Sequence, residues 1–128
     1  MMYETERTAI AQRCRAMLRA GLTTGSGGNI SVRIPDTEHV CISPTGIPYD
    51  LMQADDVPVV DLEGLRLEGE MLPSSEFPMH RALYRRRSDV QAIVHTHSPY
   101  ATTFACLREE IPAVHYLVGF AGTHVPLA

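Results

Sequence analysis

Hydrophobic positions in the first 20 residues recur at the spacing of an α-helix. Within residues 4–20 these positions are Ala9, Ile10, Ala16, Met17 and Ala20. Apolar residues at this period form one stripe along a helix, and the glycine that follows, Gly21, is a common helix stop. The pattern predicts an amphipathic helix at the start of the chain.

Strand-forming stretches follow a glycine-rich segment at residues 21–31. Residues 30–34 (ISVRI) and 39–44 (HVCISP) are rich in β-branched and apolar side chains, with the turn-forming PDTE between them. Residues 57–70 form a second pair of such stretches, which predicts a hairpin that turns at Glu63–Gly64. We therefore expect several strands connected by tight turns.

Helical and strand patterns alternate in the second half of the chain. Residues 73–87 carry two serines and an acid before a helical apolar pattern, which are helix-start signals. Residues 89–97 form an apolar run that predicts a buried strand. Ser98 and Pro99 then open a predicted helix over residues 98–109. Helices mixed with strands predict an α/β or α+β fold in which helices cover a sheet.

Composition and charge exclude several classes of protein. The chain has 128 residues, a net charge of −4 and 45% hydrophobic residues, which fits one compact domain. We expect no nucleic-acid partner, because there is no basic field, and no membrane partner, because no apolar run approaches roughly 20 residues. The charged N-terminus lacks a signal peptide's apolar segment. Cys14, Cys41 and Cys106 are widely spaced, so we expect mostly buried, reduced thiols in a cytoplasmic protein.

Two histidines, His95 and His97, stand one residue apart at the end of the predicted strand over residues 89–97. Alternate residues of a strand project to the same side, so both imidazoles can approach one metal ion. Imidazole is the commonest metal ligand, and zinc accepts nitrogen and oxygen donors. Alternatively, because the motif is short, the pair simply ends a strand, with one ring hydrogen-bonded and the other solvated.

Glu76 is the candidate carboxylate partner of the two histidines. It is predicted to lie in the first turn of the helix over residues 73–87, where an acid also interacts favourably with the helix dipole. Near a metal, a carboxylate can ligate the ion or act as a general base. His80 follows on the same helical face, and we expect it to support the site or the fold rather than to bind metal.

Three clusters of small residues indicate a phosphate-binding function. They are GSGGN at residues 25–29, SPTG at 43–46 and SS at 74–75. Each can present backbone N–H groups and short hydroxyls, which hold phosphate without bulk positive charge. Each by itself is also typical of a turn or a helix cap. Together with the metal pair and the acid, they predict a metal-dependent enzyme that acts on a phosphorylated small molecule.

Five motifs in order resemble the class II aldolase/adducin family over nearly the whole chain. They are GGNIS at 27–31, SPTG at 43–46, SSE at 74–76, HTHS at 95–98 and IPAVHY at 111–116. The resemblance implies a three-layer α/β/α sandwich with a central mixed or antiparallel sheet. It also implies a homotetramer with active sites at subunit interfaces. Residues 1–128 would be a single domain of this type, or more specifically its N-terminal portion.

The resemblance further implies a role for each site residue. His95 and His97 would hold one zinc ion per subunit, and Glu76 would be the catalytic acid/base and a zinc ligand in the absence of substrate. Tyr116 would reach a neighbouring subunit's site as a proton donor. The residues that would bind the substrate phosphate are Gly28, Asn29, Thr45, Gly46, Ser74 and Ser75. The implied reaction is reversible aldol cleavage of a ketose 1-phosphate to dihydroxyacetone phosphate and an aldehyde.

One departure from the family pattern concerns the third histidine ligand, which lies well downstream of HTHS in the family. The only later histidines are His115, within the HY motif, and His124, in the last residues. Neither fits that role, so the third ligand is expected beyond residue 128.

Other proteins of the same implied fold are pentulose-phosphate 4-epimerases, sugar-phosphate dehydratases and non-enzymatic adducin-like interaction domains. Epimerases carry aspartate where this chain has Glu76, and dehydratases tend to lose the double serine. Adducin-like proteins lack the metal histidines. The residues present therefore favour an aldolase over these alternatives.

Overall fold

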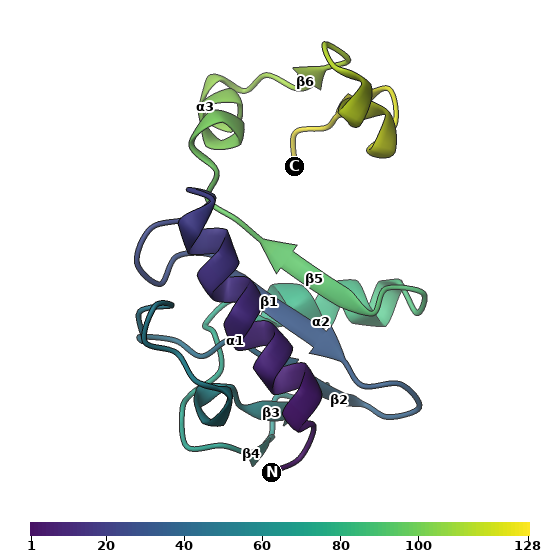
Figure 1. The fold of residues 1–128 in the computed structure, drawn as a ribbon. Coiled ribbons are helices and arrows are strands. Elements are labelled where there is room, and N and C mark those ends of the chain that lie inside the picture. Colours follow the sequence, from purple (N-terminus) through teal and green to yellow (C-terminus); the bar gives the residue numbers. More distant parts are fainter. The chain divides into compact units, whose positions relative to one another are not determined.

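A computed structural model describes residues 1–128, which is every residue of the sequence. The chain divides into two compact units, Met1–Thr96 and His97–Ala128, and each is described by itself (Figure 1). No helix combines the length and the apolar character that crossing a bilayer requires. The assignment of residues 1–128 to a single domain stays a prediction.

The first unit is built on a five-stranded antiparallel sheet with the strand order β4-β3-β2-β1-β5. Its strands are β1 (Asn29–Arg33), β2 (His39–Ile42), β3 (Val59–Asp61), β4 (Arg66–Glu68) and β5 (Ala92–His95). The hairpin predicted over residues 57–70 is confirmed as β3 and β4. Its turn is closed by the Asp61 carboxylate, which accepts N–H bonds from Glu63 at 2.9 Å and Leu65 at 2.8 Å.

Two helices cover opposite faces of this sheet, α1 (Glu4–Arg19) and α2 (Phe77–Arg86), as Figure 1 shows. Neighbouring residues of a strand point to opposite faces, and β2 divides accordingly. Cys41 belongs to the buried cluster around α1, whereas Val40 and Ile42 belong to the cluster that includes residues of α2. The predicted three-layer α/β/α arrangement with a central antiparallel sheet is thus confirmed for this unit. The short 3₁₀ helix η1 (Ala54–Asp56) packs beside α1.

The strand β5 lies at the edge of the sheet and pairs with β1 alone. The prediction of a buried strand over residues 89–97 is wrong in its burial, because Ala92 and Val94 are exposed beside an open groove rather than covered by another element. Val94 is 59% exposed. It lines an open apolar groove together with Met17 of α1 and Ile30 of β1.

The second unit contains the helix α3 (Pro99–Leu107), which confirms the helix expected after Ser98 and Pro99. It continues with β6 (Ile111–Pro112), the 3₁₀ helix η2 (Tyr116–Phe120) and β7 (His124–Val125). The strands β6 and β7 form a short antiparallel pair.

All three cysteines are free thiols, as expected from their spacing. Cys14 and Cys41 are buried on the α1 side of the sheet, and burial raises the pKa of each to about 12. Cys106 differs from the expectation of mostly buried thiols, because it is exposed on the second unit.

Candidate functional site

The candidate site begins where β1 and β5 lie side by side, because Asn29 pairs with His95 in the register of these strands. Gly28, immediately before β1, adopts a φ of +65°. A Cβ atom built there would lie 2.4 Å from the carbonyl oxygen of His95. Only glycine allows both this left-handed conformation and the close approach of the two backbones.

Glu76 is the residue that directly precedes α2, so it is the helix N-cap rather than part of the first turn as predicted. The Ser74 side chain accepts a hydrogen bond from the Glu76 N–H at 3.2 Å, and the Ser74 carbonyl accepts one from Phe77 at 3.0 Å. The Glu76 side chain makes no capping bond. Its carboxylate is therefore available to other groups.

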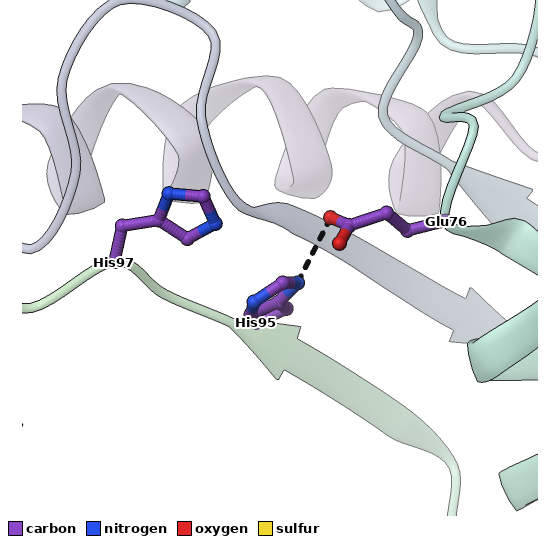
Figure 2. Close-up of side chains that lie close together, drawn as sticks. All are labelled: Glu76, His95 and His97. Atoms are coloured by element: carbon purple, nitrogen blue, oxygen red, sulfur yellow. Dashed lines mark ion pairs between the residues drawn. The ribbon is translucent and has the colours of Figure 1, made fainter. Parts of the chain in front are cut away.

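The Glu76 carboxylate faces His95, with 3.0 Å between Oε2 and the imidazole Nδ1 (Figure 2). Glu76, His95 and His97 each offer one ligand atom, and these atoms lie within 4.8 Å of one another. His97 opens the second unit, but a single residue separates it from His95, so the covalent chain keeps the two histidines near each other. Two imidazole nitrogens and one carboxylate oxygen are a donor set that fits a metal ion such as zinc.

The side chain of Asn29 connects this group to the interior. Its Nδ2 donates to Glu76 Oε2 at 2.5 Å, and its Oδ1 lies 2.5 Å from His80 Nε2. Asn29 is 2% exposed and His80 is completely buried. His80 is thus connected to Glu76 through Asn29. This agrees with the expectation that His80 supports the site or the fold. Burial lowers the pKa of His80 to about 4, so the ring is neutral near pH 7.

Backbone hydrogen bonds of Ser43 connect its loop to the Ser74–Ser75 cluster and to β1, directly after the cluster at residues 25–29. The Ser43 N–H donates to the Ile30 carbonyl at 2.9 Å, and its carbonyl accepts from the Ser74 N–H at 3.1 Å. The Thr45 N–H donates to the Leu72 carbonyl at 3.0 Å. The loop over residues 43–46 therefore lies between the start of β1 and the start of α2.

The six predicted phosphate-binding residues differ in accessibility. Thr45, Gly46 and Ser75 are exposed, whereas Gly28, Asn29 and Ser74 are buried. The Asn29 amide contacts protein groups on both sides, Glu76 and His80. The phosphate-binding roles of all six residues stay predictions. Tyr116 belongs to η2 in the second unit and is 78% exposed. Its predicted role as a proton donor also stays a prediction.

Comparison with known proteins decides the family. The family model described as the class II aldolase and adducin N-terminal domain matches residues 8–128. The chain belongs to this family. The match extends over both units of this class II aldolase-type chain and agrees with the resemblance of its five motifs.

Among its relatives is a 5-deoxy-D-ribulose 1-phosphate aldolase of Bacillus thuringiensis. The two are 47% identical over 128 residues, which cover 100% of this chain and 60% of the relative. An L-fuculose phosphate aldolase of Escherichia coli K12 is 42% identical, over 88% of this chain and 51% of the relative.

Among solved structures, an L-fuculose 1-phosphate aldolase matches with a TM-score of 0.92 and 39% identity. The match covers 98% of this chain and 59% of that one. The class II aldolase-type chain thus spans between about half and three fifths of the length of these relatives.

Sequence reasoning about this class II aldolase-type chain did not identify Ser31 and Tyr84, which form hydrogen bonds next to the site. Ser31 is a completely buried polar residue within β1, and its Oγ lies 2.7 Å both from His80 Nδ1 and from the Tyr84 hydroxyl. One signal was available, because His80 and Tyr84 are four residues apart and share a helical face. Nothing in the sequence showed that Ser31 would face them, since this depends on how α2 packs on the sheet.

Proposed function

We propose that this protein is a metal-dependent aldolase that reversibly cleaves a ketose 1-phosphate to dihydroxyacetone phosphate and an aldehyde. The observation that carries the proposal is the proximity of Glu76, His95 and His97, whose donor atoms lie within 4.8 Å of one another. Family membership and relatives that are named as phosphosugar aldolases support the same reaction. These names favour an aldolase over an epimerase, a dehydratase or an adducin-like interaction domain.

The metal is proposed to be zinc, held by His95, His97 and Glu76. In support, nitrogen and oxygen donors of these types are typical of catalytic zinc sites. When bound, the ion would supply Lewis-acid polarisation of a substrate oxygen. The family resemblance adds a third histidine ligand beyond residue 128.

Glu76 is proposed to move the proton at the substrate carbon. Its side chain is 42% exposed, so a substrate can reach it, and Asn29 restrains one of its oxygens through a hydrogen bond of 2.5 Å. A positioned carboxylate of this kind can act as a general acid or base. Tyr116 is proposed to protonate the aldehyde oxygen in the site of a neighbouring subunit, within a homotetramer.

The substrate phosphate is proposed to bind near the loop over residues 43–46. The proposed residues are Gly28, Asn29, Thr45, Gly46, Ser74 and Ser75. Two features support this assignment. The hydrogen bonds of Ser43 connect its loop to Ser74 and to Ile30, which directly follows the cluster at residues 25–29, and Thr45, Gly46 and Ser75 are accessible to a ligand.

The experiment that tests the proposal measures zinc content and dihydroxyacetone phosphate release with the protein as its gene encodes it. The probes are 5-deoxyribulose 1-phosphate and fuculose 1-phosphate, chosen from the names of the relatives. We expect one zinc ion per chain and product from at least one probe. A zinc-loaded protein that releases no dihydroxyacetone phosphate from any ketose 1-phosphate would contradict the proposal.

The Glu76→Gln variant tests the role of the carboxylate. We expect turnover to fall by about two to four orders of magnitude, because glutamine cannot accept the proton. Zinc should remain bound, since glutamine keeps an oxygen donor and both histidines are intact. The matched control is Glu63→Gln, which removes an exposed acid whose side chain forms an ion pair with Arg85 of α2. This variant should keep full activity. Unchanged turnover in Glu76→Gln would exclude the acid/base role.

A further inference from the structure

A line of buried polar side chains runs from the interface between α2 and the sheet to Glu76. Its members, from the interior outward, are Tyr84, Ser31, His80 and Asn29, and each is at most 2% exposed. The rest of the buried cluster on this side is apolar, consisting of Val40, Ile42, Val60 and Phe77. Buried polar groups cost free energy unless they are paired, so the hydrogen-bond arrangement of these four residues is tightly constrained.

Each member contacts the next through one hydrogen bond. The Tyr84 hydroxyl lies 2.7 Å from Ser31 Oγ, which lies 2.7 Å from His80 Nδ1. His80 Nε2 lies 2.5 Å from Asn29 Oδ1. Asn29 Nδ2 lies 2.5 Å from Glu76 Oε2, and this carboxylate oxygen in turn faces His95.

The chemistry of the groups fixes the direction of every bond. An ionised carboxylate only accepts, so the Asn29 NH₂ group must face Glu76, and Asn29 Oδ1 must accept from His80. His80 therefore carries its proton on Nε2. Its Nδ1 is left as an acceptor in the neutral ring, and Ser31 must donate to it. The Ser31 oxygen then accepts from the Tyr84 hydroxyl.

We propose that His80 is a positioning residue for Glu76. Its Nε2–H holds the Asn29 amide in the orientation that presents Nδ2, and not Oδ1, to the carboxylate. With the amide reversed, Oδ1 would face the carboxylate and repel it, and Glu76 would lose the restraint that keeps it beside His95. The importance of this orientation for catalysis rests on the proposed aldolase function, whereas the orientation itself does not.

Zinc affinity of the protein as its gene encodes it tests the proposal, measured by competition with a chromophoric chelator. His80→Leu removes the donor to Asn29 and should weaken zinc binding by about tenfold or more, as is typical for residues that orient metal ligands. His80→Gln can still donate to Asn29 through its amide and should restore the affinity to within about threefold of the wild type.

The matched control is Tyr84→Phe, which removes the innermost hydroxyl and leaves the bonds from Ser31 to Glu76 in place. Its zinc affinity should stay within about twofold of the wild type, although it also disturbs the buried cluster. A purely structural role of the polar line would instead weaken binding in His80→Leu and Tyr84→Phe alike. That result, or wild-type affinity in His80→Leu, would overturn the proposal.

A second measurement needs neither zinc nor turnover. Long-range ¹H–¹⁵N NMR spectra of the metal-free wild type report which imidazole nitrogen of His80 carries the proton. We expect the Nε2–H tautomer, and an Nδ1–H tautomer or a doubly protonated ring at pH 7 would overturn the proposal. If the wild type binds no zinc, the proposed function fails, and the tautomer alone decides whether His80 orients Asn29.

Discussion

At the scale of single residues, Gly28 determines how closely β1 approaches the end of β5. A side chain there would meet the His95 carbonyl oxygen at 2.4 Å, and main-chain atoms cannot move aside as a flexible side chain can. Gly46 also has a positive φ, of +80°, but no atom lies within 4 Å of a Cβ built on it. The two glycines therefore separate the effect of backbone strain from that of close packing.

We predict that Gly28→Ala destabilises the protein more than Gly46→Ala. Both variants should lose about 1 to 2 kcal/mol from left-handed strain, and Gly28→Ala should lose more because its methyl group pushes against β5. Only Gly28→Ala should also weaken zinc binding, since it displaces His95. Urea unfolding and zinc titration measure the two effects. Equal losses of stability in the two variants would show that the close approach to His95 is unimportant.

At the scale of elements, Arg7 of α1 forms polar contacts with both β4 and η1. Its side chain is 2% exposed and forms a 2.7 Å ion pair with Glu68 of β4. It also donates to the carbonyl oxygens of Ala54 at 3.2 Å and Asp55 at 3.1 Å. The backbone N–H of Met2 and the Arg7 side chain together hold the pKa of Glu68 below its ordinary value. One buried guanidinium thus satisfies groups from two other elements.

We predict that Arg7→Met lowers the free energy of unfolding by about 2 kcal/mol, because it leaves the carbonyls of Ala54 and Asp55 without this donor and removes one of the donors to Glu68. The control is Arg85→Met, which breaks an ion pair with Glu63 whose side chains are 47% and 77% exposed. An exposed pair contributes at most about 1 kcal/mol. Chemical denaturation of both variants tests this, and similar losses would contradict the anchoring role of Arg7.

The elements themselves were largely predictable from local sequence. The apolar stripe that includes Ile10 and Met17 gave the position of α1, and the turn chemistry around Gly64 gave the hairpin of β3 and β4. The burial of β5 was not predictable. An apolar run such as that containing Val94 has the same sequence whether or not another element packs on its face of the sheet, so only the tertiary structure decides its burial.

At the scale of the whole molecule, the buried neutral His80 makes folding stability depend on pH. Its pKa is about 4 in the folded protein, against an ordinary value of 6.5 that we take for the unfolded chain. Between these values the unfolded state binds more protons than the folded state, so stability falls as the pH falls. Below about pH 4 the ring is protonated in both states, and the loss of stability from this group is complete.

We predict that the free energy of unfolding decreases between pH 6.5 and pH 4, with His80 contributing on the order of 3 kcal/mol. The His80→Gln variant cannot take up the proton and should show a smaller decrease over the same range. Urea unfolding at several pH values measures both curves. The same pH dependence in the variant and the wild type would show that another group is responsible.

The sequence by itself determined the order of helices and strands, the family resemblance and the candidate ligands Glu76, His95 and His97. These follow from periodicity, turn residues and short motifs, which are properties of neighbouring residues. Only the tertiary structure decided that Glu76 faces His95 and that Ser31 lies beside His80. Contacts between residues 47 and 49 positions apart, such as those of Asn29 with Glu76 and of Ser31 with His80, depend on how α2 packs on the sheet. No local pattern encodes that packing, because it is set by the shape and burial of the whole first unit.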